Sequence, residues 1–492
     1  MQISISHESA LGNTLQDRIY NSIRSGVLDR RLVAECRLPS SRELAETLSV
    51  SRNTVVLAYE RLAAEGYIGF RRGVGTFVSK DLPEECFRTD LGNCPESTTA
   101  AGEIRRYPAI TFAGERPIII EKGSDLPSID FWYGRANKHI FPVDTWRKII
   151  AHNLARAATN LVEYPPVAGL PELRHAIAEH IAFYRGIRCD WRNIIITAGA
   201  QEAFDIIAKL FVTDGTPVAI EKPCYQGIAF ALRAHGANLV PIKVDTKGID
   251  IDHLERVATA ALVCVTPSHQ FPTGETLSLE RRLRMLRWAE RVGAYIVEDD
   301  YDSDFRYSGP PVPALAALDD SRESVIYVGT FSKALGAGIR TGFMVVPNRA
   351  LKAATSARAL ASHGQPWLEQ VVLAEFLSSG GYRRHLRRLR QEQKKARDAL
   401  FTAFGLHFGS VDLSGAEAGM HLLWRLPSEF PSAHDLALAA REFDVGIYPP
   451  SAAGAEVFGE TEHAIVLGYA SLTAPQIAKG IARVKMALDN MH

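Results

Sequence analysis

The stretch Thr330-Phe-Ser-Lys-Ala-Leu-Gly-Ala-Gly-Ile-Arg340 lies just after an apolar run, residues 325–328, that predicts a buried strand. Similar runs alternate with long helical patterns from residue 129 onward, and they cover residues 194–197, 217–220, 261–265, 295–298 and 342–346. Strands and helices that alternate in this way are typical of a large, mostly parallel sheet. We therefore expect an α/β domain over residues 129–492.

The length and composition indicate a globular protein of more than one domain. The chain has 492 residues, of which 46% are hydrophobic and 23% are charged, and one hydrophobic core rarely serves so many residues. Its net charge is zero, but residues 1–80 carry ten Arg and one Lys against eight acidic residues, a net charge of +3. A basic surplus on a small domain is compatible with contacts to nucleic-acid phosphates.

The cysteines and the apolar runs exclude several other classes of protein. The six cysteines are scattered and form no CxxC pair, which favours neither a metal site nor a disulfide framework. The first residues lack the basic segment and apolar core of a signal peptide, and no apolar run approaches the about 20 residues of a membrane span. We expect a cytoplasmic protein that does not enter a membrane.

Residues 39–55 predict a helix–turn–helix. Ser40 or Ser41 is expected to cap the first helix and Ser51 the second, because serine side chains accept hydrogen bonds from the free N–H groups of a first turn. Groove-reading residues lie in the first turn of the second helix in this motif, and here that turn holds Arg52, Asn53 and Thr54.

The residues that follow predict a basic hairpin, or wing. Residues 67–78 alternate apolar and polar side chains around glycines, with two arginines at the tip. Together with the helix pair they resemble the GntR-type winged-helix domain, in which the patterns PSxRxLA and Gly-x-Gly-Thr-Phe-Val recur. The resemblance implies a DNA-binding domain over residues 12–80 whose contacts to DNA are made by Arg42, Ser51, Arg52, Asn53, Thr54, Arg71, Arg72, Gly75 and Thr76. The alternative is an ordinary helical subdomain with a surface hairpin.

Residues 81–128 separate this domain from the α/β domain. They mix Pro, Thr, Glu and Gly without a sustained period, and we expect a linker there.

The α/β domain carries the groups that a Schiff-base cofactor needs. Such a cofactor requires a lysine amine, an acid that keeps a pyridine nitrogen protonated, a donor to the ring oxygen, an aromatic face and a phosphate site. Lys333 follows the strand at residues 325–328, and Asp299 and Tyr301 follow the apolar strand at residues 294–297. The carboxyl end of a parallel strand is where such sheets place ligand-binding groups.

Other residues complete this set. Tyr225 follows another strand and is a candidate for stacking on the ring. Small residues in Thr197-Ala-Gly-Ala-Gln201 join a strand to a helix, where backbone N–H groups bind phosphate, and the further phosphate candidates are Thr330, Ser332 and Arg340. Taken singly, each has a plainer explanation as a surface lysine, a helix-capping acid, a glycine turn or a core aromatic. The combination favours pyridoxal phosphate (PLP).

On these residues the domain resembles a fold type I aminotransferase, and the whole chain resembles the MocR/GabR subfamily of GntR regulators. Further matches are Tyr164-Pro-Pro-Val-Ala-Gly169, Thr266-Pro-Ser-His-Gln-Phe-Pro-Thr-Gly274 and Gly380-Gly-Tyr-Arg-Arg-His-Leu-Arg-Arg-Leu-Arg390. The resemblance implies a winged helix–turn–helix followed by an aminotransferase-like domain with a mostly parallel seven-stranded sheet and a small C-terminal α+β subdomain.

The resemblance also implies roles for single residues. Lys333 would be the aldimine lysine, Asp299 the partner of the pyridine nitrogen, Tyr301 the ring-oxygen donor and Tyr225 the stacking ring. The phosphate site would consist of Ala200, Gln201, Thr330, Ser332 and Arg340. The family forms a head-to-tail homodimer, in which Tyr164 would reach into the site of the neighbouring subunit.

The sequence departs from the aminotransferase pattern at two places. Phe271 stands where these enzymes usually carry an Asn that supports the ring oxygen, and either His269 or Gln270 could replace it. No Arg lies between Arg441 and Arg483, where the arginine that binds the substrate carboxylate is expected. A bidentate Arg–carboxylate pair is hard to replace by a weaker contact, so ordinary amino-acid transamination is disfavoured.

Two other groups of cations remain open. Arg135, in the segment Gly134-Arg-Ala-Asn-Lys-His139, is a candidate for binding an effector anion, and a solvated loop is the alternative. The run 382–397 holds eight Arg or Lys at helical spacing, which favours a solvated helix over a second DNA-contacting surface.

We expect a PLP-dependent transcriptional regulator that binds promoter DNA and senses a small amine, or PLP itself, through an aldimine at Lys333. The first alternative is a working aminotransferase with an accessory DNA-binding domain, and the second is a regulator whose large domain has lost PLP and only dimerises. We expect no net turnover in vivo, although the intact set of Lys333, Asp299 and Tyr301 permits a transaminase-type half-reaction.

Overall fold

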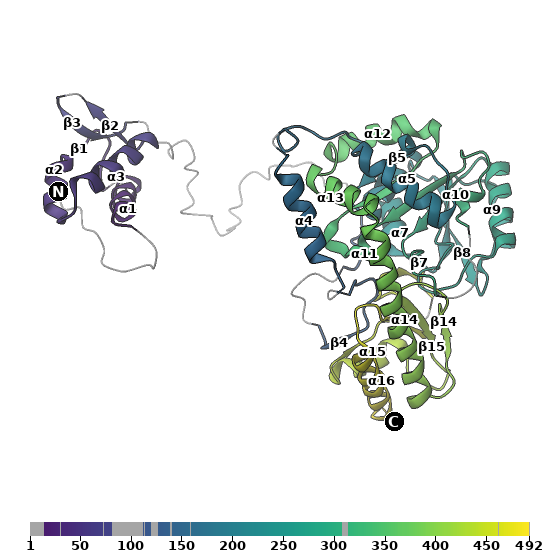
Figure 1. The fold of residues 1–492 in the computed structure, drawn as a ribbon. Coiled ribbons are helices and arrows are strands. Elements are labelled where there is room, and N and C mark those ends of the chain that lie inside the picture. The colour runs from purple at the N-terminus through teal and green to yellow at the C-terminus, as the bar shows by residue number, and fades with distance from the viewer. Residues whose placement is uncertain are drawn as a thin grey trace, which may run out of the picture. The chain divides into compact units, whose positions relative to one another are not determined.

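The chain folds into two compact units, Met1–Ala109 and Ile110–His492, in the computed structural model (Figure 1). The structure describes residues 14–29, 31–71, 73–80, 112, 114–119, 126–137, 140–157, 159–307, 313–460 and 462–491. Most of the predicted linker 81–128 and the wing residue Arg72 therefore lie outside the described residues. None of the helices in these ranges is both long and apolar enough to cross a membrane.

The N-terminal unit is a winged helix–turn–helix, which confirms the prediction. Its helices are α1 (Leu15–Leu28), α2 (Ser41–Leu48) and α3 (Arg52–Ala64), and its strands, in the order β1-β3-β2, are β1 (Arg37–Leu38), β2 (Ile68–Arg71) and β3 (Gly75–Val78). Fully buried side chains from all three helices, among them Ile19, Leu44 and Val55, form the core. The antiparallel pair β2–β3 is the wing.

Serine caps fix where the two helices of the motif begin. Ser40 caps α2: its hydroxyl accepts the N–H of Glu43 at 3.2 Å, and the Glu43 carboxylate accepts the N–H of Ser40 at 2.8 Å. This reciprocal capping box chooses Ser40 over Ser41. Ser51 caps α3 by accepting the N–H of Thr54 at 3.1 Å.

The large unit is built on a mixed eight-stranded sheet in the order β5-β13-β12-β11-β10-β6-β8-β9. Its strands are β5 (Ile194–Thr197), β6 (Pro217–Lys222), β8 (Asn238–Asp245), β9 (Gly248–Ile249), β10 (Leu262–Val265), β11 (Tyr295–Asp300), β12 (Val325–Thr330) and β13 (Gly342–Val345). The central pairs from β12 to β8 are parallel, and β5, β13 and β9 pair antiparallel. The predicted fold class is confirmed. The sheet has one strand more than the predicted seven, because the two-residue β9 folds back on β8.

Helices cover both faces of the sheet. Alternate strand residues belong to different cores: Ile195 packs with α6, α7 and α12, whereas Ile194 and Ile196 pack with α5 and α13. Burial on both sides explains why the strands are continuous apolar runs rather than alternating ones. The helices here are α4 (Val143–Leu154), α5 (Pro171–Arg185), α6 (Ala200–Phe211), α7 (Gln226–Ala234), α8 (Ile251–Arg256), α9 (Leu279–Val292), α10 (Leu315–Leu318), α11 (Ser332–Leu335), α12 (Asn348–Ser362) and α13 (Trp367–Ser378), with short 3-10 turns Trp191–Asn193 and Ala337–Ile339.

A smaller α+β subdomain completes the unit, with its strands in the order β14-β15-β18. Its elements are α14 (Gly381–His407), β14 (Asp412–Ser414), β15 (His421–Arg425), α15 (Ala433–Glu442), β16 (Val445–Gly446), β17 (Ala455–Glu456), β18 (Ala464–Gly468) and α16 (Ala474–Asp489). Two short pairs tie it to earlier parts of the chain: β4 (Ile129–Asp130) lies parallel to β16, and β7 (Cys224–Tyr225) lies antiparallel to β17. The segment after β4 is thereby held between the sheet and the subdomain.

Candidate functional site

A cavity of about 1280 Å³ lies at the carboxyl ends of the central strands. Parts of its wall are the ends of β11 and β12, the segment after β4, the first turn of α6, and residues 471–476 before and within α16. The predicted residues Lys333, Asp299, Tyr301, Tyr225, Ala200, Gln201, Thr330, Ser332, Arg340 and Arg135 all line it. Predicted residues that lie as far apart in the sequence as Arg135 and Arg340 therefore line the same cavity.

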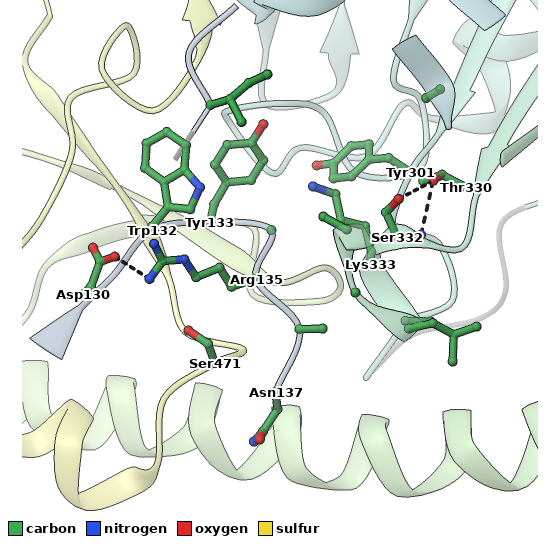
Figure 2. A pocket seen from close by; sticks show the side chains of 18 of the residues that line it. Asp130, Trp132, Tyr133, Arg135, Asn137, Tyr301, Thr330, Ser332, Lys333 and Ser471 are labelled. Atoms are coloured by element: carbon green, nitrogen blue, oxygen red, sulfur yellow. Dashed lines mark hydrogen bonds and ion pairs between the residues drawn. The ribbon is translucent and has the colours of Figure 1, made fainter. Parts of the chain in front are cut away.

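Lys333 lies in the short helix α11, three residues after the end of β12, and lines the cavity. Its Nζ lies 4.8 Å from the centre of the Tyr133 ring and 5.9 Å from that of Tyr301 (Figure 2). Burial lowers the pKa of the Lys333 amine, and the carboxylates of Asp302 and Asp299 oppose that shift. An amine that loses its proton more readily than a surface lysine is suited to attack a carbonyl carbon.

Asp299 is the second-last residue of β11 and is 6% exposed. Its Oδ1 is buried without a hydrogen-bond partner in the described part of the chain. Burial and the neighbouring Asp300 raise the pKa of this carboxyl to about 8, against the opposing effect of Lys333. A buried carboxylate without a donor is unfavourable, and a protonated pyridine nitrogen would supply both the missing donor and the missing charge. Asp299 therefore fits the acid that PLP requires.

Tyr301 contacts a buried His–Asp pair. The His269 Nδ1 lies 2.7 Å from Asp302 Oδ2 and 3.2 Å from the Tyr301 hydroxyl oxygen. His269 and Asp302 are each 2% exposed. The pair fixes the position of the Tyr301 hydroxyl at the cavity wall.

This geometry bears on the choice between His269 and Gln270 left open by the sequence. The Gln270 amide donates to the carbonyls of Pro223 and Phe271 at 2.7 Å, and its oxygen accepts the Thr273 hydroxyl at 2.7 Å. The Gln270 side chain is thus engaged by its own turn and by Pro223, whereas His269 contacts the Tyr301 hydroxyl. Of the two neighbours, His269 is therefore the one in contact with Tyr301.

Aromatic side chains close the cavity around the expected place of a planar ring. Tyr225 lies 6.1 Å from Phe271, and Tyr133 lies 4.4 Å from Phe271 between ring centres. A Cβ on Gly227 would lie 2.3 Å from the Tyr225 ring. The tyrosine can therefore occupy this position only because residue 227 has no side chain.

Hydroxyl groups and an arginine gather at the other end of the cavity. The Thr330 hydroxyl lies 3.1 Å from that of Ser332, and Ala200 and Gln201 form the first turn of α6. Arg340 donates to the carbonyl of Ala198. A Cβ on Gly199, whose φ is +93°, would lie 3.3 Å from the Arg340 guanidinium. Backbone N–H groups of a helix start, two hydroxyls and an arginine are the usual donors to a phosphate.

The side of the cavity formed by the subdomain holds a paired rather than a free arginine. Arg135 Nη1 lies 2.7 Å from Asp130 Oδ2, and the Tyr448 hydroxyl donates to Asp130 Oδ1 at 2.6 Å. Strand β18 supplies no cation here: Val466, in the middle of the strand, is fully buried with Leu423 and Ala453. The uncharged residues Ser471, Leu472, Thr473 and Gln476 line this side.

Tyr164 does not line the cavity of its own chain. It is 85% exposed, beside His363 at 5.9 Å between ring centres. Other exposed apolar side chains near it in sequence are Leu154, Leu161 and Val162.

The predicted DNA contacts lie in the N-terminal unit as follows. Ser51, Arg52 and Asn53 are exposed at the start of α3, with Thr54 partly buried behind them, and Arg42 is exposed at the start of α2, where it pairs with Glu46 at 3.3 Å. In the wing, Arg71 is exposed and pairs with Glu35 at 3.1 Å. Thr76 is only 8% exposed, because it lies on the central strand β3 and its side chain is on the same buried face of that strand as Val78.

Sequence reasoning missed Asp130 and Tyr133, which line the cavity, and Asp302, which pairs with His269. Asp302 stands in the acidic stretch that already pointed to Asp299 and Tyr301, so the strand-end argument could have included it. Asp130 and Tyr133 had no such signal, because the pairing of β4 with β16 that brings them here joins positions more than 300 residues apart.

Comparisons with known proteins agree with this architecture. Residues 133–484 match the family model "Aminotransferase class I and II", and residues 15–78 match "Bacterial regulatory proteins, gntR family". The chain is 35% identical to the probable rhizopine catabolism regulatory protein MocR of Rhizobium meliloti, over 96% of this chain and 93% of that protein. It is 31% identical to the HTH-type transcriptional regulator TauR of Rhodobacter capsulatus, over 96% of each.

A solved enzyme structure resembles the large unit. It is LysN, an alpha-aminoadipate aminotransferase of Thermus thermophilus complexed with N-(5'-phosphopyridoxyl)-L-leucine. The two are 30% identical with a TM-score of 0.68, and the match covers 74% of this chain and 92% of the enzyme.

Proposed function

This chain belongs to the MocR/GabR subfamily of gntR-type transcriptional regulators, which joins a DNA-binding domain to a domain of the aminotransferase class I and II family, and from that premise we propose that it senses an amine at Lys333. An aminotransferase fold of this class implies PLP as the cofactor. The N-terminal domain binds promoter DNA, and the bound amine, or PLP itself, changes that binding. The observation that carries the proposal is the pair of Lys333 and the unpartnered Asp299 Oδ1 on one cavity.

Different residues of the cavity would bind different parts of PLP. Lys333 supplies the amine for its aldehyde, Asp299 the acceptor for its ring nitrogen, Tyr301 the donor to its ring oxygen and Tyr225 the stacking face. Its phosphate would be held by Ala200, Gln201, Thr330, Ser332 and Arg340. When bound, PLP supplies an aldehyde that reacts with amines and a ring that withdraws electrons.

In this proposal the side chains of the protein influence the reactivity of PLP through the protonation of Lys333 and the placement of the Tyr301 hydroxyl. The lowered pKa of Lys333 keeps a larger fraction of its Nζ unprotonated, so that it can react and can later take up a proton. His269 and Asp302 hold the Tyr301 hydroxyl where a ring oxygen needs a donor. The aromatic wall of Tyr133, Phe271 and Tyr225 limits the access of water.

Control of DNA binding requires more than one subunit in this proposal. The exposed apolar side chains of Leu154, Leu161, Val162 and Tyr164 support a subunit contact in a head-to-tail homodimer. Two heads then read two half-sites, with base and phosphate contacts from Arg42, Ser51, Arg52, Asn53, Thr54 and the wing residues Arg71, Arg72, Gly75 and Thr76. Since a promoter-binding protein acts where the DNA is, we assign it to the cytoplasm. Effector binding shifts the dimer between two arrangements with different affinity for DNA.

The alternative of a working aminotransferase is disfavoured by the substrate side of the cavity. Residues 471–476 and β18 offer no arginine there, and Arg135 is already paired with Asp130. The complete cofactor set argues equally against a domain that has lost PLP.

Absorption spectra and DNA binding together test the proposal. The purified protein is mixed with PLP, and the Lys333→Ala variant is treated in the same way. We expect a visible absorption band of bound PLP in the parent protein that the variant lacks. DNA fragments recovered by selection from sheared genomic DNA are then titrated with and without PLP and a panel of amines. Sustained turnover of common amino donors and keto acids, without any effect on DNA binding, would overturn the proposal in favour of an enzyme.

A further inference from the structure

The Arg135–Asp130 pair stands on the cavity side opposite the phosphate residues. Figure 2 shows the guanidinium of Arg135 turned back toward Asp130 below Trp132, with Ser471 on the side away from Trp132. Asp130 is 5% exposed, and Arg135 is about one-third exposed, at 34% of its side chain. The pair is therefore a mostly buried charge pair whose arginine half faces the cavity.

The charges of the cavity leave no cation for a carboxylate. Among the described residues that line it, the cationic side chains are Arg135, Lys333 and Arg340. Lys333 reacts with carbonyls, and Arg340 lies at the phosphate end against Ala198 and Gly199. Arg135 is neutralised by Asp130, to which Arg441 also contributes a favourable charge interaction.

A carboxylate ligand would disturb this pair. To bind it as arginines bind amino-acid substrates, Arg135 would have to leave Asp130 as a buried anion without its partner, which is strongly unfavourable. If the pair stayed intact, the ligand carboxylate would lie next to another carboxylate. Tyr448 holds Asp130 in place from the other side, and the ring of Trp132 packs against that of Tyr448 at 4.9 Å.

An uncharged polar group would instead complete the pair. Asp130 Oδ2 is buried, and apart from its ion pair with Arg135 at 2.7 Å it accepts no hydrogen bond of regular geometry in the parts of the chain that are described. A hydroxyl or amide can donate to that oxygen after a small shift of Arg135 and can accept from the guanidinium at the same time. Buried polar atoms without partners are few in folded proteins and often mark ligand contacts.

We propose that the effector is an amine without a carboxylate on its amino-bearing carbon, and that a hydroxyl or amide of this amine binds the Arg135–Asp130 pair. This inference rests on the proposed function, in which an amine reacts at Lys333. It makes Asp130 a specificity-determining residue: the acid converts an arginine that would select amino acids into a neutral pair that rejects them.

Matched pairs of amines test the inference. Ethanolamine and serine differ only by the carboxylate, and so do putrescine and ornithine. Binding to the PLP-loaded protein is measured by calorimetry, and the effect on DNA binding is measured in parallel. We expect ethanolamine to bind at least about tenfold more tightly than serine, the equivalent of one hydrogen bond to a charged group.

Two variants separate the roles of the pair. Asp130→Asn keeps the shape of the side chain and removes its negative charge, so Arg135 loses its ionic partner. The preference for ethanolamine over serine should then fall by about tenfold or reverse. Arg135→Gln should weaken the binding of ethanolamine and should not strengthen the binding of serine. The exposed pair of Asp144 and Arg147, at 3.0 Å on α4, provides the matched control Asp144→Asn, which should leave the preference unchanged. Melting curves and the PLP absorption band identify any variant that fails to fold.

The outcomes distinguish this inference from the proposed function. A parent protein that binds PLP and DNA but prefers serine, and loses that preference in Arg135→Gln, overturns the inference alone. A response to PLP with no response to either member of any pair overturns it as well. If every variant, including Lys333→Ala, kept the PLP absorption band, that result would instead overturn the proposed function.

Discussion

Gly134 lies against the reactive end of Lys333: a Cβ built on Gly134 would fall 2.4 Å from the lysine Nζ. Gly134 also has a φ of +76°, a backbone conformation that residues with side chains rarely adopt. The segment after β4 therefore reaches the lysine only because residue 134 is glycine. This segment therefore restricts the positions that the Lys333 Nζ can occupy.

We predict that Gly134→Ala weakens PLP binding by about tenfold or more, because the new methyl group must displace the lysine amine from its position. Titration of the cofactor-free protein with PLP, followed by visible absorption, measures the change. Gly293→Ala is a matched control. Gly293 has a φ of +71° but no atom within 4 Å of its added Cβ, so both variants carry a backbone strain of about 1–2 kcal/mol and only one disturbs Lys333. Equal losses of PLP affinity in the two variants would show that strain, and not contact with Lys333, explains the effect.

A second prediction concerns Asp299 and pH. Its pKa of about 8 in the folded protein compares with about 3.9 in an unfolded chain, so between these values the folded state holds a proton that the unfolded state has released. The stability of the cofactor-free protein therefore falls as pH rises through this interval, by the part that Asp299 contributes, and levels off above it. Asp299→Asn removes that part.

Denaturant unfolding of the cofactor-free proteins, at one pH well below 8 and one above it, measures the difference. We expect the variant to gain stability relative to the parent as pH rises, and to bind PLP more weakly at every pH because the ring nitrogen loses its anionic partner. The other titrating groups are common to both proteins and cancel in the difference. If the difference in unfolding free energy between the parent and Asp299→Asn did not change with pH, Asp299 would be excluded as the buried acid that titrates in this range.

The acidic stretch at the end of β11 shows how far the sequence could predict this site. Side chains alternate between the two faces of a strand, so Asp299 and its neighbours cannot share one environment. Glu298 accepts the N–H groups of Leu315 and Ala316 at 2.9 Å, and Asp300 pairs with Arg185 at 2.7 Å. These two acids make contacts inside the fold, and Asp299 faces the cavity. Placement at the carboxyl end of a parallel strand was sufficient to predict the region of the site. The alternation of side chains along the strand explains why Asp299, and not Glu298 or Asp300, faces the cavity.

The substrate side could not be predicted in the same way. Arg135 was a candidate in the sequence, but its partner Asp130 was not, because the pair depends on the long-range contact of β4 with β16. Likewise the sequence could not choose between His269 and Gln270, which are neighbours with similar polarity. The cis peptide bond between Phe271 and Pro272 and the hydrogen bonds of Gln270 belong to a turn whose shape only the folded chain defines. In the wing, Thr76 was expected to contact DNA and its side chain is buried.

A third prediction separates the two functions of the chain. Arg52 is exposed at the start of α3, where its Nε lies 3.5 Å from the Ser41 hydroxyl. Arg52→Ala should weaken specific DNA binding by about 10- to 100-fold and leave the PLP band unchanged. Arg31, exposed in the same unit and paired with Asp29 at 3.1 Å, lies outside the helix–turn–helix and gives the control Arg31→Ala. Footprints that Arg52→Ala and the control leave equally intact would exclude Arg52 from the DNA contacts.

A fourth prediction tests whether Tyr164 acts in the neighbouring subunit. Tyr164 is 85% exposed and does not line the cavity of its own chain, so its predicted contact with PLP requires a dimer. We expect Tyr164→Ala to weaken PLP binding. Mixed dimers of a Tyr164→Ala chain and a Lys333→Ala chain, carrying different affinity tags, then distinguish the two arrangements.

If Tyr164 serves the partner's site, the mixed dimer contains one site with an intact Lys333 and an intact Tyr164, and one site that lacks both. Half of the PLP sites should then bind with the affinity of the parent protein. If Tyr164 serves its own chain, each site of the mixed dimer lacks one of the two residues, and no site should regain that affinity. The same titration on the two parental variants provides the baselines. Because the two arrangements predict different numbers of intact sites, the result depends on counting sites and not on the size of the Tyr164 contribution.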